Sequence, residues 1–300
     1  MKLAPIALFT YNRLVHTRRT VEALEKNELA TASDLFIFSD GAKAGDDKKN
    51  VDEVREYLLG IKGFKSVTLI EREMNLGLAE NIISGVSQII GEFGNIIVLE
   101  DDLITSAYFV RYMNDALSLY ENEEGVASIH GYVYPVKERL QETFFIRGAD
   151  CFGWATWKRG WDIFIADGKM LLDQLQQTGQ THAFDFDGAY PYTKMLKDQT
   201  EGRNDSWAVR WYASAFLRNK FTLYPGTSLV HHIGGDGSGT HSGFGDILDV
   251  VLSESRIIVS RIEVKEDEQA RLAFVKFLPK VTRPKILYRI RRKIKKLFSA

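Results

Sequence analysis

Residues 95–103 read NIIVLEDDL. The short apolar run at 96–99 predicts a strand buried on both faces. Three consecutive acids follow it at 100–102. Carboxylates this close repel one another unless a positive charge neutralises them, and a divalent cation does so. Mg²⁺ and Mn²⁺ prefer carboxylate oxygens and share their coordination shell with ligand phosphates. The alternative is a solvated acidic turn, or an N-cap cluster for a helix that begins near Thr105.

Three similar apolar runs precede this one, and helical patterns separate them. Strands are expected at residues 6–9, 35–38, 67–70 and 96–99. Apolar residues at helical spacing predict helices over 14–24, 51–61 and 78–93. The alternating order predicts right-handed βαβ crossovers, so we expect an α/β fold with a mainly parallel central sheet flanked by helices.

Polar residues follow each predicted strand, and the carboxyl ends of parallel strands share one edge where ligands bind. These residues are Thr10, Tyr11, Asn12 and Arg13, then Asp40, then Asn75, Gly77 and Asn81, and finally Glu100, Asp101 and Asp102. Arg13 is expected to pair with a phosphate; the alternative is that its side chain is only solvated. Asp40 suits a nucleobase or ribose, or is a turn residue before Gly41. The amides after Asn75 can face an anion, or Asn75 caps a helix.

The pattern loosens after residue 125 into short strands, glycines and aromatics. Asp205 precedes a helical segment, where it can serve as a general base or as an N-cap. Trp154 and Trp207 offer flat faces to sugar rings, or belong to the core. His231, His232 and His241 flank a glycine-rich stretch that suits a lid over a diphosphate, with one histidine lent to a metal; a plain surface loop is the alternative.

Composition narrows the class of protein. The chain has 300 residues, 45% of them apolar, and one cysteine, which excludes an internal disulfide framework. There is no apolar run of 18 residues and no basic-then-apolar leader, so we expect a cytoplasmic protein. Eight of the 39 Lys and Arg residues lie in 283–300, which leaves 31 against 40 acids in the body. A body of that charge does not favour nucleic-acid binding.

Residues 283–300 form a separate, strongly basic segment. Ile286, Ile290, Ile294 and Leu297 recur at helical spacing among the cations. This pattern predicts a basic amphipathic helix that lies on an anionic membrane, which would make the protein peripheral on the inner face of the cell membrane. A disordered basic end, or a helix docked on the acidic body, is the alternative.

The ordered motifs resemble the GT-A glycosyltransferases, in particular family-2-like enzymes and the N-acetylglucosaminyltransferase I group. The likeness rests on FTYNR at 9–13, SDG at 39–41, NLGLAEN at 75–81 and VLEDDL at 98–103, and it spans roughly residues 3–245. The acidic triplet departs from the Asp-x-Asp spacing of many members. Residues 1–125 would be the nucleotide-sugar half of the domain, 126–282 the acceptor half and 283–300 the basic tail.

The resemblance implies a role for each motif. Asp40 would contact the base, Asp101 the ribose or donor sugar, and Glu100 the transferred sugar. Asp102 would ligate Mn²⁺ or Mg²⁺ beneath the diphosphate. Of the three histidines beside the glycine-rich stretch, we expect His232 to be the second ligand. Asp205 matches the catalytic base of inverting members. The acceptor contacts would be Phe152, Gly153, Trp154 and Trp207.

The sequence therefore predicts a metal-dependent glycosyltransferase that moves a sugar from a nucleotide-sugar donor to a hydroxyl of a glycan or lipid-linked acceptor. A catalytically inactive carbohydrate- or nucleotide-binding module on the same fold is the alternative. A phosphatase of the haloacid dehalogenase type is disfavoured, because its nucleophile would stand at position 38, which is Phe. A sugar-nucleotide pyrophosphorylase would need a glycine-rich, arginine-bearing loop after the first strand, and that loop is missing.

Overall fold

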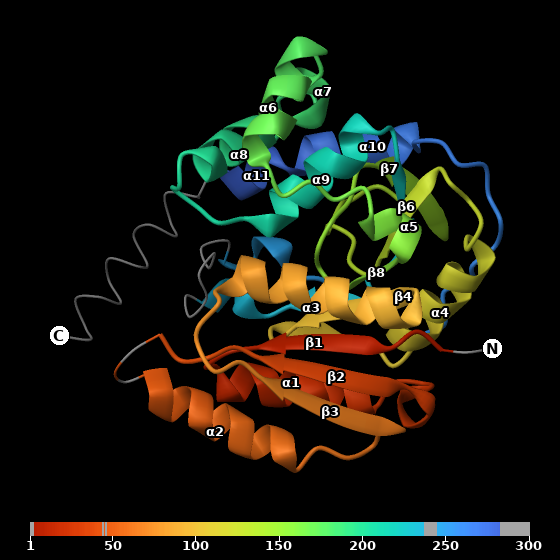
Figure 1. Ribbon diagram of the computed structural model, residues 1–300. Coiled ribbons are helices and arrows are strands. Elements are labelled where there is room, and N and C mark those ends of the chain that lie inside the picture. Colours follow the sequence, from red (N-terminus) through yellow and green to blue (C-terminus); the bar gives the residue numbers. More distant parts are fainter. Residues whose placement is uncertain (1–2, 44, 46, 237–244, 283–300) are drawn as a thin grey trace, which may run out of the picture.

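Eight strands form one sheet in the order β3-β2-β1-β4-β8-β6-β9-β7 in the computed structural model of the chain (Figure 1), which describes residues 3–43, 45, 47–236 and 245–282. The sheet strands are β1 (Ile6–Thr10), β2 (Asp34–Ser39), β3 (Ser66–Glu71), β4 (Asn95–Glu100), β6 (Val126–His130), β7 (Thr143–Arg147), β8 (Trp154–Trp157) and β9 (Phe221–Pro225). A second, two-stranded sheet pairs β5 (Leu103–Thr105) with β10 (Val230–His232).

The helices fall into two groups along the chain. The first are α1 (Leu14–Glu25), α2 (Asp47–Leu59), α3 (Leu78–Phe93) and α4 (Phe109–Leu119). The second are α5 (Lys158–Trp161), α6 (Gly168–Gln177), α7 (Thr181–Phe184), α8 (Tyr192–Thr200), α9 (Trp207–Leu217), α10 (Glu268–Phe277) and α11 (Pro279–Thr282). Three 3₁₀ turns, η1 (Ala30–Ala32), η2 (Gly234–Asp236) and η3 (Gly245–Leu248), complete the described elements.

The predicted α/β architecture is confirmed. β1, β2, β3 and β4 pair in parallel through crossover helices, so their carboxyl ends lie at one edge. One expectation for this half is wrong: β3 is not buried on both faces. Its apolar residues Val67, Leu69 and Ile70 are only half-buried, because β3 is the last strand of the sheet.

The second half of the sheet is mixed rather than parallel. β8 runs antiparallel between β4 and β6, β9 pairs with β6 in parallel, and β7 pairs with β9 antiparallel. The β4–β8 pairing joins both halves of the chain in one sheet. Its register sets Val98 opposite Trp154, so the residues before β8 run alongside the acids that follow β4.

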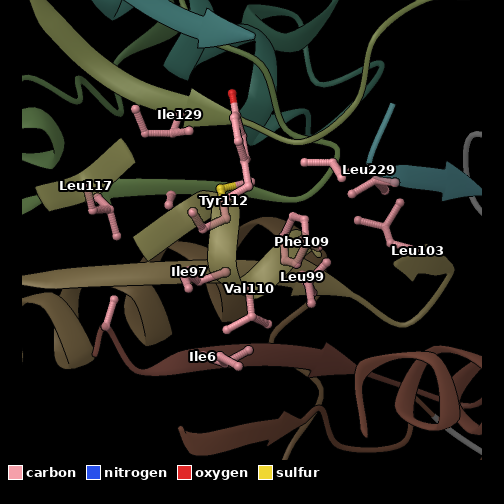
Figure 2. Packing of buried hydrophobic residues seen from close by; sticks show 14 of the residues in the cluster. Ile6, Ile97, Leu99, Leu103, Phe109, Val110, Tyr112, Leu117, Ile129 and Leu229 are labelled. Carbon is pink, nitrogen blue, oxygen red and sulfur yellow. The ribbon is translucent and has the colours of Figure 1, made fainter. Parts of the chain in front are cut away.

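Alternate residues of β1 pack into two different hydrophobic clusters. Ile6 and Leu8 face a cluster with α1, α2 and α4, whereas Ala7 and Phe9 face one with α3 and α9. α1 and α2 accordingly lie on one side of the sheet and α3 on the other (Figure 1). Figure 2 shows part of the first cluster, where Phe109 and Tyr112 of α4 pack near the strands.

No helix among residues 3–43, 47–236 and 245–282 is both long and apolar enough to span a bilayer. The predicted amphipathic helix at 283–300 lies outside the described residues.

Candidate functional site

One cavity of about 800 Å³ lies at the carboxyl ends of the parallel strands. It collects residues from both halves of the chain. The predicted site residues in its lining are Thr10, Tyr11, Asn12, Arg13, Asp40, Asn75, Gly77, Asn81, Glu100, Asp101, Asp102, Phe152, Asp205, Trp207 and His232.

Gly153 and Trp154 are not part of this lining, which corrects their assignment as acceptor contacts. The Trp154 side chain is 1% exposed and packs against Trp161, Trp207 and Trp211, with ring centroids 5.6–5.8 Å away. Gly153 has φ +66°, and a Cβ there would lie 2.7 Å from a methyl group of Val230. Both residues therefore build the core beneath the site.

Arg13 holds the acidic corner together. Its Nη2 donates to Asp101 Oδ1 and, at 2.8 Å, to Asp102 Oδ2. Thr20 Oγ1 donates to the Asp101 carbonyl at 2.8 Å, which ties α1 to the end of β4. The guanidinium thus takes the neutralising position that the sequence assigned to a divalent cation.

The three acids differ in their protonation. Burial raises the pKa of Glu100 to about 8, and the charges of Asp102 and Asp101 add to the rise. Burial also raises the pKa of Asp101, which Arg13 only partly offsets. For Asp102, burial is outweighed by the neighbouring His232 imidazole and the charge of Arg13, which lower the pKa to about 2. Glu100 therefore keeps its proton to a higher pH than an ordinary carboxyl group, whereas Asp102 is a carboxylate at neutral pH.

His232 reaches this corner through the small sheet. The β10–β5 register places it opposite Leu103, and its Nε2 lies 3.6 Å from Asp102 Oδ2. Gly234 permits this approach, because a Cβ there would lie 2.3 Å from Asp102 Oδ2 and 2.8 Å from His232 Nε2.

Asp102 and His232 fit a divalent cation as two ligands of an incomplete shell. Donor atoms 3.6 Å apart can both lie about 2.0–2.2 Å from one ion. No group of three or more His, Cys, Asp or Glu side chains converges in this way among the described residues. Such a site relies on oxygens from a bound phosphate, as Mg²⁺ sites commonly do.

Asp40 does not have the role that the sequence assigned to it. Its Oδ1 accepts from the amides of Gly41 (2.9 Å) and Leu76 (2.8 Å). Its Oδ2 accepts from the Gly77 amide and from Asn75 Nδ2, both at 3.0 Å. A carboxylate accepts about four hydrogen bonds, and these four fill its capacity. Asp40 therefore holds the loop before α3 in place instead of contacting a nucleobase.

The hydrogen bonds to Asp40 also correct the anion expected at Asn75–Gly77, because the carboxylate of Asp40 itself occupies two of those amides. Asn81 is likewise engaged, since its Oδ1 accepts from Arg72 Nε at 3.1 Å. These residues support the cavity wall rather than present free polar atoms to it.

Asp47 is a lining residue that the sequence interpretation missed. Its two oxygens accept from the Tyr11 hydroxyl at 2.9 Å and from Asn12 Nδ2 at 3.0 Å. It lies at the start of α2, where an acidic residue is ordinarily explained by its favourable interaction with the positive end of the helix dipole. No local pattern distinguishes that role from a site role.

Asp205 is free of the capping role that competed with catalysis. Ser206 caps α9, because its side chain accepts from the Val209 amide. The Asp205 carboxylate is 72% exposed and lies 3.4 Å from Arg210 Nη2. It therefore faces the cavity from the second half of the chain as an accessible carboxylate.

His231 does not join the acidic corner. His231 Nδ1 lies 3.0 Å from the Val250 carbonyl, and its Nε2 lies 3.8 Å from Asp249. His241 lies outside the described residues, as does most of the predicted glycine-rich lid.

No family model matches the chain, and no curated protein matches it. Among solved structures, TarS of S. aureus is 12% identical with a TM-score of 0.32, over 49% of this chain and 25% of that one. A TarS fragment, residues 1–349, is 10% identical with a TM-score of 0.33, over 51% of this chain and 47% of the fragment. A mannosyltransferase from Pyrobaculum calidifontis, in complex with GDP-Man and Mn²⁺, is 10% identical with a TM-score of 0.40, over 72% of this chain and 71% of that one.

These structural neighbours include nucleotide-sugar glycosyltransferases. The chain covers well under two thirds of the two TarS chains. None of the three bears the name of an N-acetylglucosaminyltransferase I. Likenesses this distant assign neither a reaction nor a substrate to this chain.

Proposed function

We propose that the chain is a metal-dependent, inverting glycosyltransferase of the GT-A type, which moves a sugar from a nucleotide-diphosphate donor to a hydroxyl. One observation carries the proposal. A single cavity brings the Asp102–His232 pair, at the carboxyl end of a parallel strand, together with the accessible carboxylate of Asp205.

The donor diphosphate belongs on the side of the cavity lined by Arg13. Arg13 is the cation nearest the Asp102–His232 pair in the described structure. A diphosphate gives Arg13 a partner other than the two aspartates.

Asp102 and His232 would hold the divalent cation. When bound there, the cation supplies Lewis-acid stabilisation of the charge that grows on the departing diphosphate. Asp102 is ionised at neutral pH and so provides a strong ligand. Glu100 lines the same corner, where its carboxyl group would hydrogen-bond a hydroxyl of the transferred sugar.

Asp205 would act as the base toward the acceptor. An ionised carboxylate on the opposite side of the sugar removes the proton from the attacking hydroxyl, and attack from that side inverts the anomeric centre. Asp205 comes from the second half of the chain and lines the same cavity as Asp102, which supports this division of roles.

The experiment is a donor panel. Hydrolysis or transfer is measured with UDP-, GDP-, dTDP- and CMP-sugars, with and without Mn²⁺. The proposal expects turnover of at least one nucleotide-diphosphate sugar that requires the metal. Asp205→Asn should lower that turnover by roughly 10²–10⁴-fold and leave nucleotide affinity within twofold. The matched variant Asp162→Asn changes an exposed carboxylate paired with Lys158 and should keep full turnover.

Tight binding of a nucleotide-sugar without turnover of any donor would instead favour a binding module. Wild-type turnover in Asp205→Asn would remove Asp205 from the role of base.

We also propose that the basic segment 283–300 holds the enzyme on the anionic inner face of the cell membrane, where a glycan or lipid-linked acceptor for surface glycan assembly would be found. Eight cations without an acid, at amphipathic spacing, support this proposal.

A further inference from the structure

The cavity has a second arm that the donor does not explain. We use the name aromatic arm for the lining residues Tyr134, Asp150, Phe186, Tyr190, Tyr192 and Tyr224. They come from the segment after β6, the segment before β8, the stretch that runs from the loop after α7 into the first residue of α8, and β9. Five aromatic residues and one carboxylate therefore line this part of the cavity.

Asp150 keeps hydrogen-bonding capacity toward the cavity. Its Oδ2 accepts from the Tyr224 hydroxyl at 3.2 Å and its Oδ1 from the Cys151 amide at 2.8 Å. His130 Nε2 lies 3.9 Å from Asp150 Oδ1. This nitrogen accepts a hydrogen bond from the Phe152 amide at 3.0 Å, so it has no proton to donate to Asp150. Each carboxylate oxygen can accept about two hydrogen bonds, which leaves room for donors from a ligand.

The aromatic residues of the arm are held in place rather than loosely packed. Tyr190 and Tyr192 have ring centroids 4.4 Å apart, and Tyr192 packs on Tyr212 at 4.9 Å. Phe186 has φ +49°, an unfavourable backbone conformation for a bulky residue. Arg271 secures it by lying 5.1 Å from the centre of the Phe186 ring and by pairing with Asp187 at 2.8 Å.

The arm connects with the acidic corner. The β4–β8 register carries the residues before Trp154 alongside the end of β4, and the Phe152 ring stacks on His232 with centroids 4.8 Å apart. Asp205 and Trp207 line the same cavity. A molecule in the arm therefore shares one cavity with a donor at Asp102 and with the carboxylate assigned as base.

We propose that the aromatic arm binds a neutral sugar residue of the acceptor, whose ring hydroxyls donate to Asp150 and whose C–H face packs on the tyrosine rings. This inference rests on the proposed function. Asp150 repels an anionic ligand. The tyrosines of the arm carry phenolic hydroxyl groups, which both donate and accept hydrogen bonds, as a polyol requires. The alternative ligand is a cation bound by the same aromatic rings, and the experiment below distinguishes a cation from a neutral sugar.

The probe is a panel of methyl glycosides of glucose, galactose, mannose, N-acetylglucosamine and N-acetylgalactosamine. Binding to the full chain with Mg²⁺ and UDP or GDP is followed by saturation-transfer NMR and titration. At least one glycoside should bind, and Asp150→Asn should weaken it roughly tenfold or more, because a charge-assisted hydrogen bond is lost. Tyr190→Ala should weaken the same glycoside several-fold. Asp162→Asn, outside the cavity lining, should leave its affinity unchanged.

Absence of binding by every glycoside, equal affinity in the Asp150→Asn and Asp162→Asn variants, or preferential binding of choline would each overturn the inference. Nucleotide affinity is recorded for the same samples and should stay within twofold in Asp150→Asn. If glycoside binding is lost but nucleotides still bind, the aromatic arm is refuted and the proposed transferase is not. If no nucleotide binds but the glycosides bind as expected, the donor site is refuted and the aromatic arm is not.

Discussion

Arg13→Gln tests the electrostatics of the acidic corner. The guanidinium and the two carboxylates are largely buried, with side chains 18%, 6% and 13% exposed for Arg13, Asp101 and Asp102. Removing one partner of a buried ion pair costs about 3–5 kcal/mol, because the remaining charge is left uncompensated. Arg13 keeps some contact with solvent, so we take the lower end, about 3 kcal/mol. In a chain of 300 residues that corresponds to a fall in Tm of roughly 5 °C.

The assay is thermal unfolding followed by circular dichroism, with and without Mn²⁺. Because the variant lacks its internal cation, Mn²⁺ should raise its Tm more than that of the wild type. Arg18→Gln, on the same helix, is the control: Arg18 lies 5.3 Å from the Tyr57 ring centre and should contribute at most about 1 kcal/mol. If Arg13→Gln melts within about 2 °C of the wild type, or gains nothing from Mn²⁺, the electrostatic reasoning is wrong.

Three further predictions concern other parts of the chain. Asp40→Ala removes the acceptor of four hydrogen bonds and should destabilise the fold by about 3 kcal/mol or more in urea unfolding; an unchanged midpoint would contradict its role in holding the loop before α3. Burial lowers the pKa of His130, so below a pH of about 6.5 the unfolded chain binds a proton that the native chain does not bind. The free energy of unfolding should therefore be highest above that pH and fall below it. The fall should be steeper than in His130→Gln by up to about 1.4 kcal/mol per pH unit. Equal pH slopes for the two proteins would exclude this linkage. Deletion of 283–300 should abolish sedimentation with anionic vesicles, whereas undiminished binding would show that the segment is not the anchor.

The parts of the fold that depend on local pattern could be predicted. The apolar runs at 6–9, 35–38 and 96–99 form buried strands, and the helical patterns between them form α1, α2 and α3. The acids after β4 lie in the cavity because strand ends of a parallel sheet meet at one edge.

What failed depends on contacts between distant residues. Whether Trp154 faces a ligand or the core is set by three other tryptophans that β8 brings around it. Asp40 is saturated by the loop after β3, which only the β2–β3 register places beside it. The aromatic arm draws on four separate segments, so no single stretch of sequence reveals it.

The measurement that tests the central claim most directly is anomalous X-ray scattering at the manganese edge, from crystals of the full chain soaked with Mn²⁺ and either UDP or GDP. We expect one anomalous peak bonded to an Asp102 oxygen and in contact with the diphosphate, with His232 turned toward it. A bound diphosphate whose manganese lies elsewhere, or no peak at Asp102 while Arg13 still pairs with both aspartates, would contradict the account.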